Sequence, residues 1–336
     1  MDEQKNPPNG NNDQGEDNKL QPISPESNTW SPNWERSKPF PHRPEPTPFS
    51  ALYLPIGLFL VTVFTTLWAG AYQPLYAQYL NAPVGPIDFL LSDPSLLMYG
   101  IPFSFTLLSI LVTHEFGHYY LARVHKVPAS LPLFLPGPPF LVGTFGAIIR
   151  MRSPIYNRRA LFDIGVAGPI AGFVVALVAL VIGLMRSSIG VDDHTYNLNF
   201  GEPLVLKMLV WMIHGPISDG YDLFLDPIAV AAWMGLFITA LNLIPIGQLD
   251  GGHVIYALFG SYHRNFAYSV MFVMLVLGFF GWHGWFLWAG LAGIVGLSHP
   301  PVIDPQATLG RARVRVAWAT LGIFILCFVP VPFYLG

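Results

Sequence analysis

LLMYGIPFSFTLLSILVTHEFGHYYLAR, residues 96–123, is a long apolar run that ends in a cluster of ionisable side chains. Residues 96–113 contain no charged residue at all. About 20 apolar residues in a helix cross the hydrocarbon core of a bilayer. The stretch therefore predicts a transmembrane helix that carries polar groups close to one end.

The composition of the whole chain agrees with this prediction. Of its 336 residues, 52% are hydrophobic and only 11% are charged, whereas soluble domains carry about 25% charged residues. This excludes a water-soluble domain, and it also excludes nucleic-acid binding through a basic surface. The single cysteine, Cys327, excludes a disulfide framework and a zinc cluster built from cysteines.

Six further apolar runs extend the prediction to an all-α polytopic membrane protein with about seven transmembrane helices. The seven predicted spans are 52–74, 96–123, 161–185, 228–247, 266–281, 284–298 and 316–334. Residues 1–48 are different, because they are rich in Pro, Asn and acidic residues and nearly free of aliphatic side chains. We expect them to form a disordered cytoplasmic tail, followed by a membrane-embedded domain over 49–336.

The charges of the connections predict the orientation. The connection 123–159 holds six basic residues and no acidic residue, and 299–315 holds three arginines, whereas 187–227 is acidic. The positive-inside rule then places the N-terminus, 123–160, 248–265 and 299–315 in the cytoplasm. We expect the membrane to be a bacterial cytoplasmic membrane.

One apolar stretch does not fit a transmembrane helix. Residues 131–149, LPLFLPGPPFLVGTFGAII, contain four prolines and three glycines, which would break a helix. Pro136–Pro139 predicts a turn, and 140–149 an extended segment. The stretch is either an interfacial loop or a re-entrant hairpin near the site, since irregular backbone at membrane depth needs protein or a wet cavity around it.

The cluster at the end of the first stretch is His114-Glu115-Phe116-Gly117-His118. On a helix, residues four apart share a face, so both imidazoles can bind one Zn²⁺ while Glu115 stands beside it as a general base. Ionisable groups within a membrane segment usually mark function. The alternative is a hydrogen-bonded polar cluster that packs two helices.

Two histidines do not complete a catalytic zinc site, which takes three protein ligands and leaves a position for water. Asp250 is the best candidate for the third ligand, because it follows Pro245 and precedes Gly251-Gly252 at the predicted cytoplasmic end of another span. There a tight turn could bring a short carboxylate to the metal. His253 is a rival ligand.

The two motifs, His114 to His118 and Leu241-Asn242-Leu-Ile-Pro245 through Asp250-Gly251, resemble those of the site-2 protease family of intramembrane zinc metalloproteases. The segment 143–169 resembles the plant plastid and bacterial branch. The resemblance covers a core of about 96–262. It implies a protease that cleaves membrane-protein substrates with a transmembrane helix in the lipid bilayer.

The resemblance also implies roles for single residues. His114, His118 and Asp250 would bind Zn²⁺, and Glu115 would activate water. Asn242 would hold the substrate backbone or the oxyanion. Gly168 lies in a small-residue pattern with Gly165 and Gly172, which permits close helix packing and gives it a supporting role. A PDZ domain, which many members insert, has no room in 186–227.

The competing interpretation is a non-proteolytic polytopic protein, either a transporter or a scaffold with a structural metal site. A transporter would show inverted repeats or paired broken helices, and the sequence has no convincing internal repeat. Other intramembrane proteases carry Gly-x-Ser-Gly or Gly-x-Gly-Asp, and neither string occurs here. The sequence names no substrate and no oligomeric state.

Overall fold

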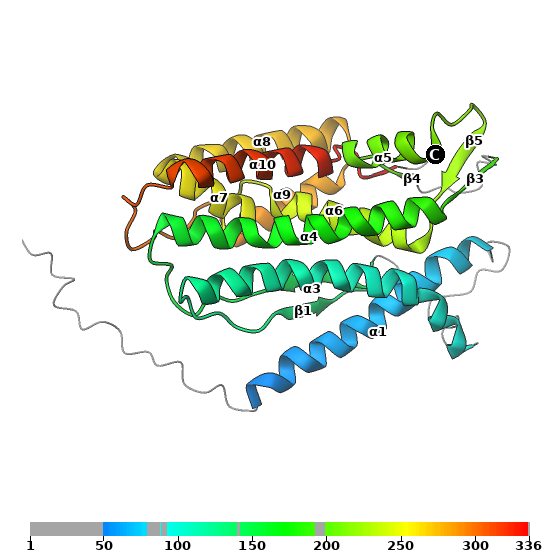
Figure 1. Ribbon diagram of the computed structural model, residues 1–336, viewed down its shortest axis with the longest axis horizontal. Coiled ribbons are helices and arrows are strands. Elements are labelled where there is room, and N and C mark those ends of the chain that lie inside the picture. Colours follow the sequence, from blue (N-terminus) through cyan, green and yellow to red (C-terminus); the bar gives the residue numbers. More distant parts are fainter. Residues whose placement is uncertain (1–49, 79–87, 89–92, 140–141, 192–198, 335–336) are drawn as a thin grey trace, which may run out of the picture. The chain divides into compact units, whose positions relative to one another are not determined.

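The structure, a computed structural model, describes residues 50–78, 88, 93–139, 142–191 and 199–334. The predicted tail at 1–48 lies outside these residues. The described residues fall in one unit, Thr47–Gly336, and most of them are helical (Figure 1). This confirms the helical class of the prediction.

Four helical runs in the described part of the chain are long and apolar enough to cross a membrane. They are α1 (Ser50–Gln78), a 3-10 turn with α3 (Pro94–Gly100 and Ile101–Val124), α4 (Arg158–Arg186), and the run Asp250–Phe280. The last run consists of α7 (Asp250–Phe259), a 3-10 turn (Gly260–Tyr262) and α8 (His263–Phe280). Gly260 has φ +60°, which interrupts the helix between α7 and α8.

The other helices do not confirm the seven predicted spans, because three of them have only 11 to 16 residues and the last, with 18 residues, carries three arginines. They are α5 (Leu204–His214), α6 (Pro227–Asn242), α9 (Gly284–Val295) and α10 (Gly310–Cys327). Two boundaries differ from the prediction for local reasons. The last helix begins at Gly310 and ends at Cys327, because Pro330 and Pro332 follow and cannot continue it. α5 was missed altogether, since its 11 residues are too few for a span.

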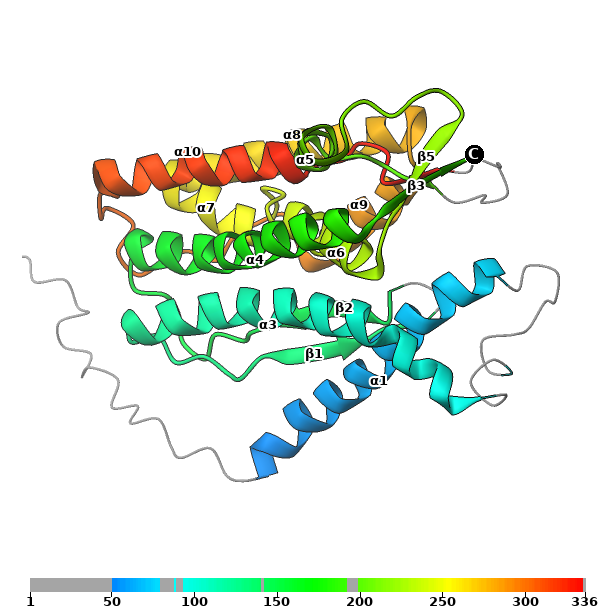
Figure 2. The same cartoon turned by 45° about the vertical axis from the view of Figure 1, so that its right-hand side comes forward.

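Helices α3 and α4 lie side by side in both views and form the centre of the fold (Figures 1 and 2). Small residues allow this close approach. A Cβ built on Gly117 of α3 would lie 2.6 Å from the carbonyl oxygen of Ala167 in α4, closer than real side chains come. The contact between these two helices therefore depends on glycine, as in other closely packed membrane helices.

The Pro/Gly-rich stretch forms a β-hairpin. Strand β1 (Leu133–Pro136) pairs antiparallel with β2 (Thr144–Ile148), with Leu135 opposite Gly146. Gly143, with φ +80°, precedes β2, and its carbonyl accepts a hydrogen bond of 2.6 Å from the Thr65 hydroxyl of α1. The hairpin lies alongside α3 in both views (Figure 2). The predicted extended segment 140–149 is thus a strand over Thr144–Ile148 only, the predicted turn begins after Pro136, which belongs to β1, and residues 140–141 lie outside the described chain.

Two further two-stranded sheets occur among the described residues. Strand β3 (Ser188–Val191) pairs with β5 (Tyr221–Phe224), and β4 (Asn199–Phe200) pairs with β6 (Phe333–Tyr334). The strict all-α prediction was therefore too simple. Three of these strands lie in connections between helices and β6 follows α10, and their pairing satisfies backbone groups that no helix satisfies.

Candidate metal centre

His114 and His118 lie on one face of α3, as their spacing predicts. Both side chains are buried, and their Nε2 atoms are 3.1 Å apart. At this distance the two Nε2 atoms face each other across a small gap. α3 thus supplies two nitrogen donors to one point.

Asp250 approaches the same point from a different part of the chain. Its Oδ2 lies 3.2 Å from His114 Nε2 and 3.3 Å from His118 Nε2. Asp250 is the first residue of α7, which begins after the turn that ends α6. Gly247 has φ +53° in this turn, and a Cβ on Gly251 would overlap the carbonyl oxygen of Leu243. Glycines therefore allow the turn that brings the carboxylate to the histidines.

The three residues fit a zinc ion by geometry and by chemistry. His114, His118 and Asp250 form a group that could hold a metal ion. Ligands about 2.0–2.2 Å from the centre of a tetrahedron are roughly 3.3–3.6 Å apart. The observed separations of 3.1, 3.2 and 3.3 Å are close to this range. Two imidazoles and one carboxylate are also a donor set that Zn²⁺ uses in hydrolases, leaving one position open.

A backbone carbonyl fixes the orientation of His118. Ile164 of α4 places its carbonyl oxygen 2.7 Å from His118 Nδ1. Because a carbonyl oxygen only accepts, Nδ1 carries the proton, and the lone pair of Nε2 faces the group. Ligating histidines are commonly oriented in this way. Sequence reasoning missed Ile164, since a backbone carbonyl leaves no signal in the residue type.

Glu115 and Asn242 lie next to the three residues. Glu115 follows His114 on α3, and its side chain is buried, with 6% exposed. Asn242 is the last residue of α6, and its Nδ2 lies 3.4 Å from His114 Nε2. The structure thus brings both residues to the same region as the predicted ligands. Neither belongs to the group that could hold the metal.

His253, the rival third ligand, lies in a different cluster. Its Nδ1 is 2.7 Å from His299 Nε2, and His299 Nδ1 donates to the carbonyl oxygen of Pro300. Burial, and then the neighbouring His253, lower the pKa of His299 to about 3, so this imidazole is neutral. The backbone N–H of His299 also donates to His263 Nε2. This histidine cluster was not predicted, because its members are 10 and 36 residues apart.

The glycines of α4 explain how the helices come so close to the histidines. A Cβ on Gly168 would overlap the imidazole of His118, and a Cβ on Gly172 would lie 3.1 Å from His114 Nδ1. A Cβ on Gly165 would lie 2.9 Å from His253 Cβ. Two glycines of the predicted small-residue pattern, Gly168 and Gly172, therefore face the two histidines of the group, and the third, Gly165, faces His253.

Known proteins are similar to this chain over the region that contains both motifs. Residues 102–280 match peptidase family M50. The probable chloroplastic zinc metalloprotease EGY1 of Oryza sativa subsp. japonica is 32% identical over 231 residues, which are 65% of this chain and 39% of the relative. EGY2 of Arabidopsis thaliana, also named a probable chloroplastic zinc metalloprotease, is 32% identical over 187 residues, 54% of this chain and 33% of the relative.

EGY1 of Arabidopsis thaliana is 30% identical over 234 residues, which are 65% of this chain and 41% of that relative. The chain therefore spans about two fifths or less of the length of these curated relatives. The family match, in contrast, covers more than half of the chain and includes both motifs. The chain therefore belongs to peptidase family M50, the site-2 protease family that its two motifs predict.

Proposed function

We propose that this protein is an intramembrane zinc metalloprotease that hydrolyses peptide bonds within or near transmembrane segments of membrane proteins. The observation that carries the proposal is the convergence of His114, His118 and Asp250, with Glu115 buried beside them, among apolar helices. Membership of peptidase family M50 and the names of the relatives support the same activity.

His114, His118 and Asp250 would hold Zn²⁺ in this proposal. The bound ion would supply Lewis acidity and lower the pKa of a coordinated water towards about 7. The protein contributes orientation, since Ile164 fixes the tautomer of His118 and the close contact at Gly168 confines its ring. Gly168 would thus support the site and its transition state by leaving room for the His118 imidazole.

Glu115 would move the proton. Its carboxylate accepts a proton from the attacking water, whose oxygen bonds to the scissile carbonyl carbon. When the carbon–nitrogen bond breaks, the carboxylic acid donates that proton to the leaving amine. The position of Glu115 directly after His114 on α3 keeps it next to the ligands without making it one of them.

Asn242 and the hairpin would hold the substrate. The Asn242 amide lies beside His114, where it could donate to the substrate backbone or to the developing oxyanion. A transmembrane helix hides its carbonyls in hydrogen bonds, so the cleaved segment must unwind. Strand β2 would then bind the unwound segment by strand addition, with the hairpin re-entering the membrane beside α3. The support is its paired, extended backbone alongside that helix.

The membrane placement completes the proposal. About seven segments would cross a bacterial cytoplasmic membrane, with the N-terminus and the site toward the cytoplasm. The support comes from the basic residues of 123–159 and 299–315. The membrane-embedded protease domain would cover 49–336, with a catalytic core of about 96–262.

The deciding experiment compares membrane peptides from cells that carry the wild-type chain or Glu115→Gln. The variant should retain its zinc, because Glu115 is not a ligand, and cleavage products seen with the wild type should be absent. A transporter or scaffold with a structural metal would give the same peptides with both chains. That result would replace the protease by the non-proteolytic interpretation.

A further inference from the structure

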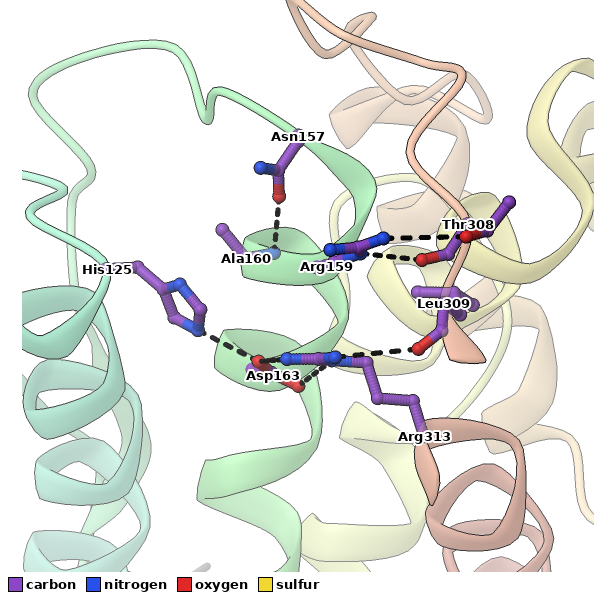
Figure 3. A network of polar contacts seen from close by, with 8 residues as sticks. All are labelled: His125, Asn157, Arg159, Ala160, Asp163, Thr308, Leu309 and Arg313. Carbon is purple, nitrogen blue, oxygen red and sulfur yellow. Dashed lines mark hydrogen bonds and ion pairs between the residues drawn. The ribbon is translucent and has the colours of Figure 1, made fainter. Parts of the chain in front are cut away.

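A polar network joins the first turns of α4 to α3, α7 and α10. Asp163 of α4 is its centre (Figure 3). Its carboxylate accepts two hydrogen bonds of 2.7 Å from Arg313 of α10, one on each oxygen. His125, at the C-terminal end of α3, lies 2.9 Å from the same carboxylate. Asp163 thus links α3, α4 and α10.

The geometry of the Arg313 contact is specific. A guanidinium that binds both oxygens of one carboxylate fixes distance and angle together. The two side chains are also largely shielded from solvent, with 18% of Asp163 and 32% of Arg313 exposed. The network is therefore better placed to hold the helices than an exposed ion pair would be.

Asp163 is also adjacent to the residue that orients His118. Its neighbour in the chain, Ile164, is the residue whose carbonyl accepts the hydrogen bond from His118 Nδ1. His118 lies on α3, the helix whose end is held through His125. The Asp163 carboxylate therefore constrains both partners of that hydrogen bond, Ile164 through the chain and His118 through α3.

The first turn of α4 also holds the helix of the third ligand. Arg158 donates hydrogen bonds of 2.6 Å to the carbonyl oxygens of Ala257 and Leu258, at the C-terminal end of α7. α7 begins at Asp250. All three elements that supply the metal-binding group or its orientation, α3, α4 and α7, thus meet at the first turns of α4.

We propose that Asp163 is a positioning residue for the metal site, held in place by Arg313 of the C-terminal helix α10. The inference rests on the proposed function, because it concerns the zinc ligands. It also extends that function to a part of the chain outside the family match, which ends at residue 280. Without the Arg313 contact, α4 would be free to shift against α3, and His118 would lose its fixed orientation.

The experiment uses the purified full chain in detergent or nanodiscs, with Zn²⁺ and Co²⁺ as probes. Asp163→Asn and Arg313→Gln should each weaken zinc affinity about tenfold, the lower end of the range for residues that support a ligating histidine. Arg313→Lys keeps the charge but not the two-point contact, so its zinc affinity should fall by less than that of Arg313→Gln. The double variant should lose no more zinc affinity than either single variant, because the two residues act as a pair.

The chain offers a matched control at the opposite end of α4. Arg186 and Asp226 also form an arginine–aspartate pair, with 3.0 Å between Nε and Oδ2. Arg186→Gln removes that pair far from the network of Asp163. It should leave zinc affinity unchanged, even if it lowers the temperature of unfolding.

The visible spectrum of the Co²⁺-loaded protein separates positioning from plain stability, since it reports ligand geometry. We expect altered absorption bands in Asp163→Asn. The bands of Arg313→Lys should be closer to those of the wild type. Lower unfolding temperatures with unchanged zinc affinity and unchanged cobalt spectra would make the pair merely structural and overturn the inference. A wild-type chain that binds no zinc would overturn the proposed function as well, which distinguishes the two failures.

Discussion

Replacing Gly168 by alanine tests how tightly the fold holds the zinc ligands. The added Cβ would lie 2.6 Å from His118 Cε1, and closer still to Nε2, whereas ordinary contacts begin at about 3.4 Å. The imidazole, or the whole of α4, must therefore move by about 1 Å. Metal–ligand distances tolerate only about ±0.2 Å, so this displacement cannot be absorbed within the site.

The expected loss in zinc affinity is about 10²-fold, or roughly 2.7 kcal/mol, as for other misplacements of about 1 Å in catalytic sites. Helix propensity cannot explain such a loss, because alanine is favoured over glycine in a helix by about 1 kcal/mol. The substitution should therefore stabilise α4 locally while it weakens the metal site.

The assay is zinc affinity measured by competition with a chelator on the purified protein, with unfolding temperature as a second measurement. Two other glycine-to-alanine variants complete a graded series. Gly172→Ala should have a small effect, since its Cβ lies 3.1 Å from His114 Nδ1 and needs only a few tenths of an ångström. Gly322→Ala in α10 meets no atom within 4 Å and should have none. Wild-type affinity in Gly168→Ala would refute the reasoning.

The other predictions concern the remaining residues of the site and its place in the membrane. Asp250→Ala should lower the zinc content per purified chain, whereas His253→Ala should not; the reverse result would make His253 the third ligand. Asn242→Ala should keep zinc and slow cleavage about 10²-fold, so unchanged turnover would remove Asn242 from oxyanion binding. Ala147→Pro in β2 should impair cleavage because it removes a backbone donor, whereas Ala147→Ser should be mild; equal activity of the two variants counts against strand addition. In a Cys327→Ser background, Ser153→Cys should resist a membrane-impermeant thiol reagent on intact cells and Ser218→Cys should react. Labelling of Ser153→Cys with protection of Ser218→Cys would invert the predicted orientation, and labelling of both would mean a wrong number of spans between them, with His118 and Asp250 on opposite faces.

The sequence by itself was sufficient for the properties that depend on local patterns. Low charge and long apolar runs indicated the membrane class, because each span must be apolar along its own length. The spacing of His114 and His118 placed both on one helical face, since that geometry is set by five consecutive residues. The prolines and glycines of 131–149 likewise excluded a helix from local conformational rules.

The helix boundaries were predicted less well, and for a physical reason. Hydropathy identifies an apolar stretch without showing where its backbone hydrogen bonds end. The predicted span 228–247 therefore included the turn after Asn242, and the predicted connection 248–265 in fact contains α7. The strands β3 to β6 pair across long stretches of chain, which no local pattern shows.

Only the tertiary structure brought Asp250 to His114, 136 residues away in the chain, and separated His253 from them by pairing it with His299. It also assigned the orientation of His118 to the Ile164 carbonyl and linked that turn to Arg313. These contacts depend on how the helices pack. That packing is decided by many small van der Waals contacts along the whole length of the helices. A backbone carbonyl, moreover, is the same in every residue type, so its role becomes visible only when the chain is folded.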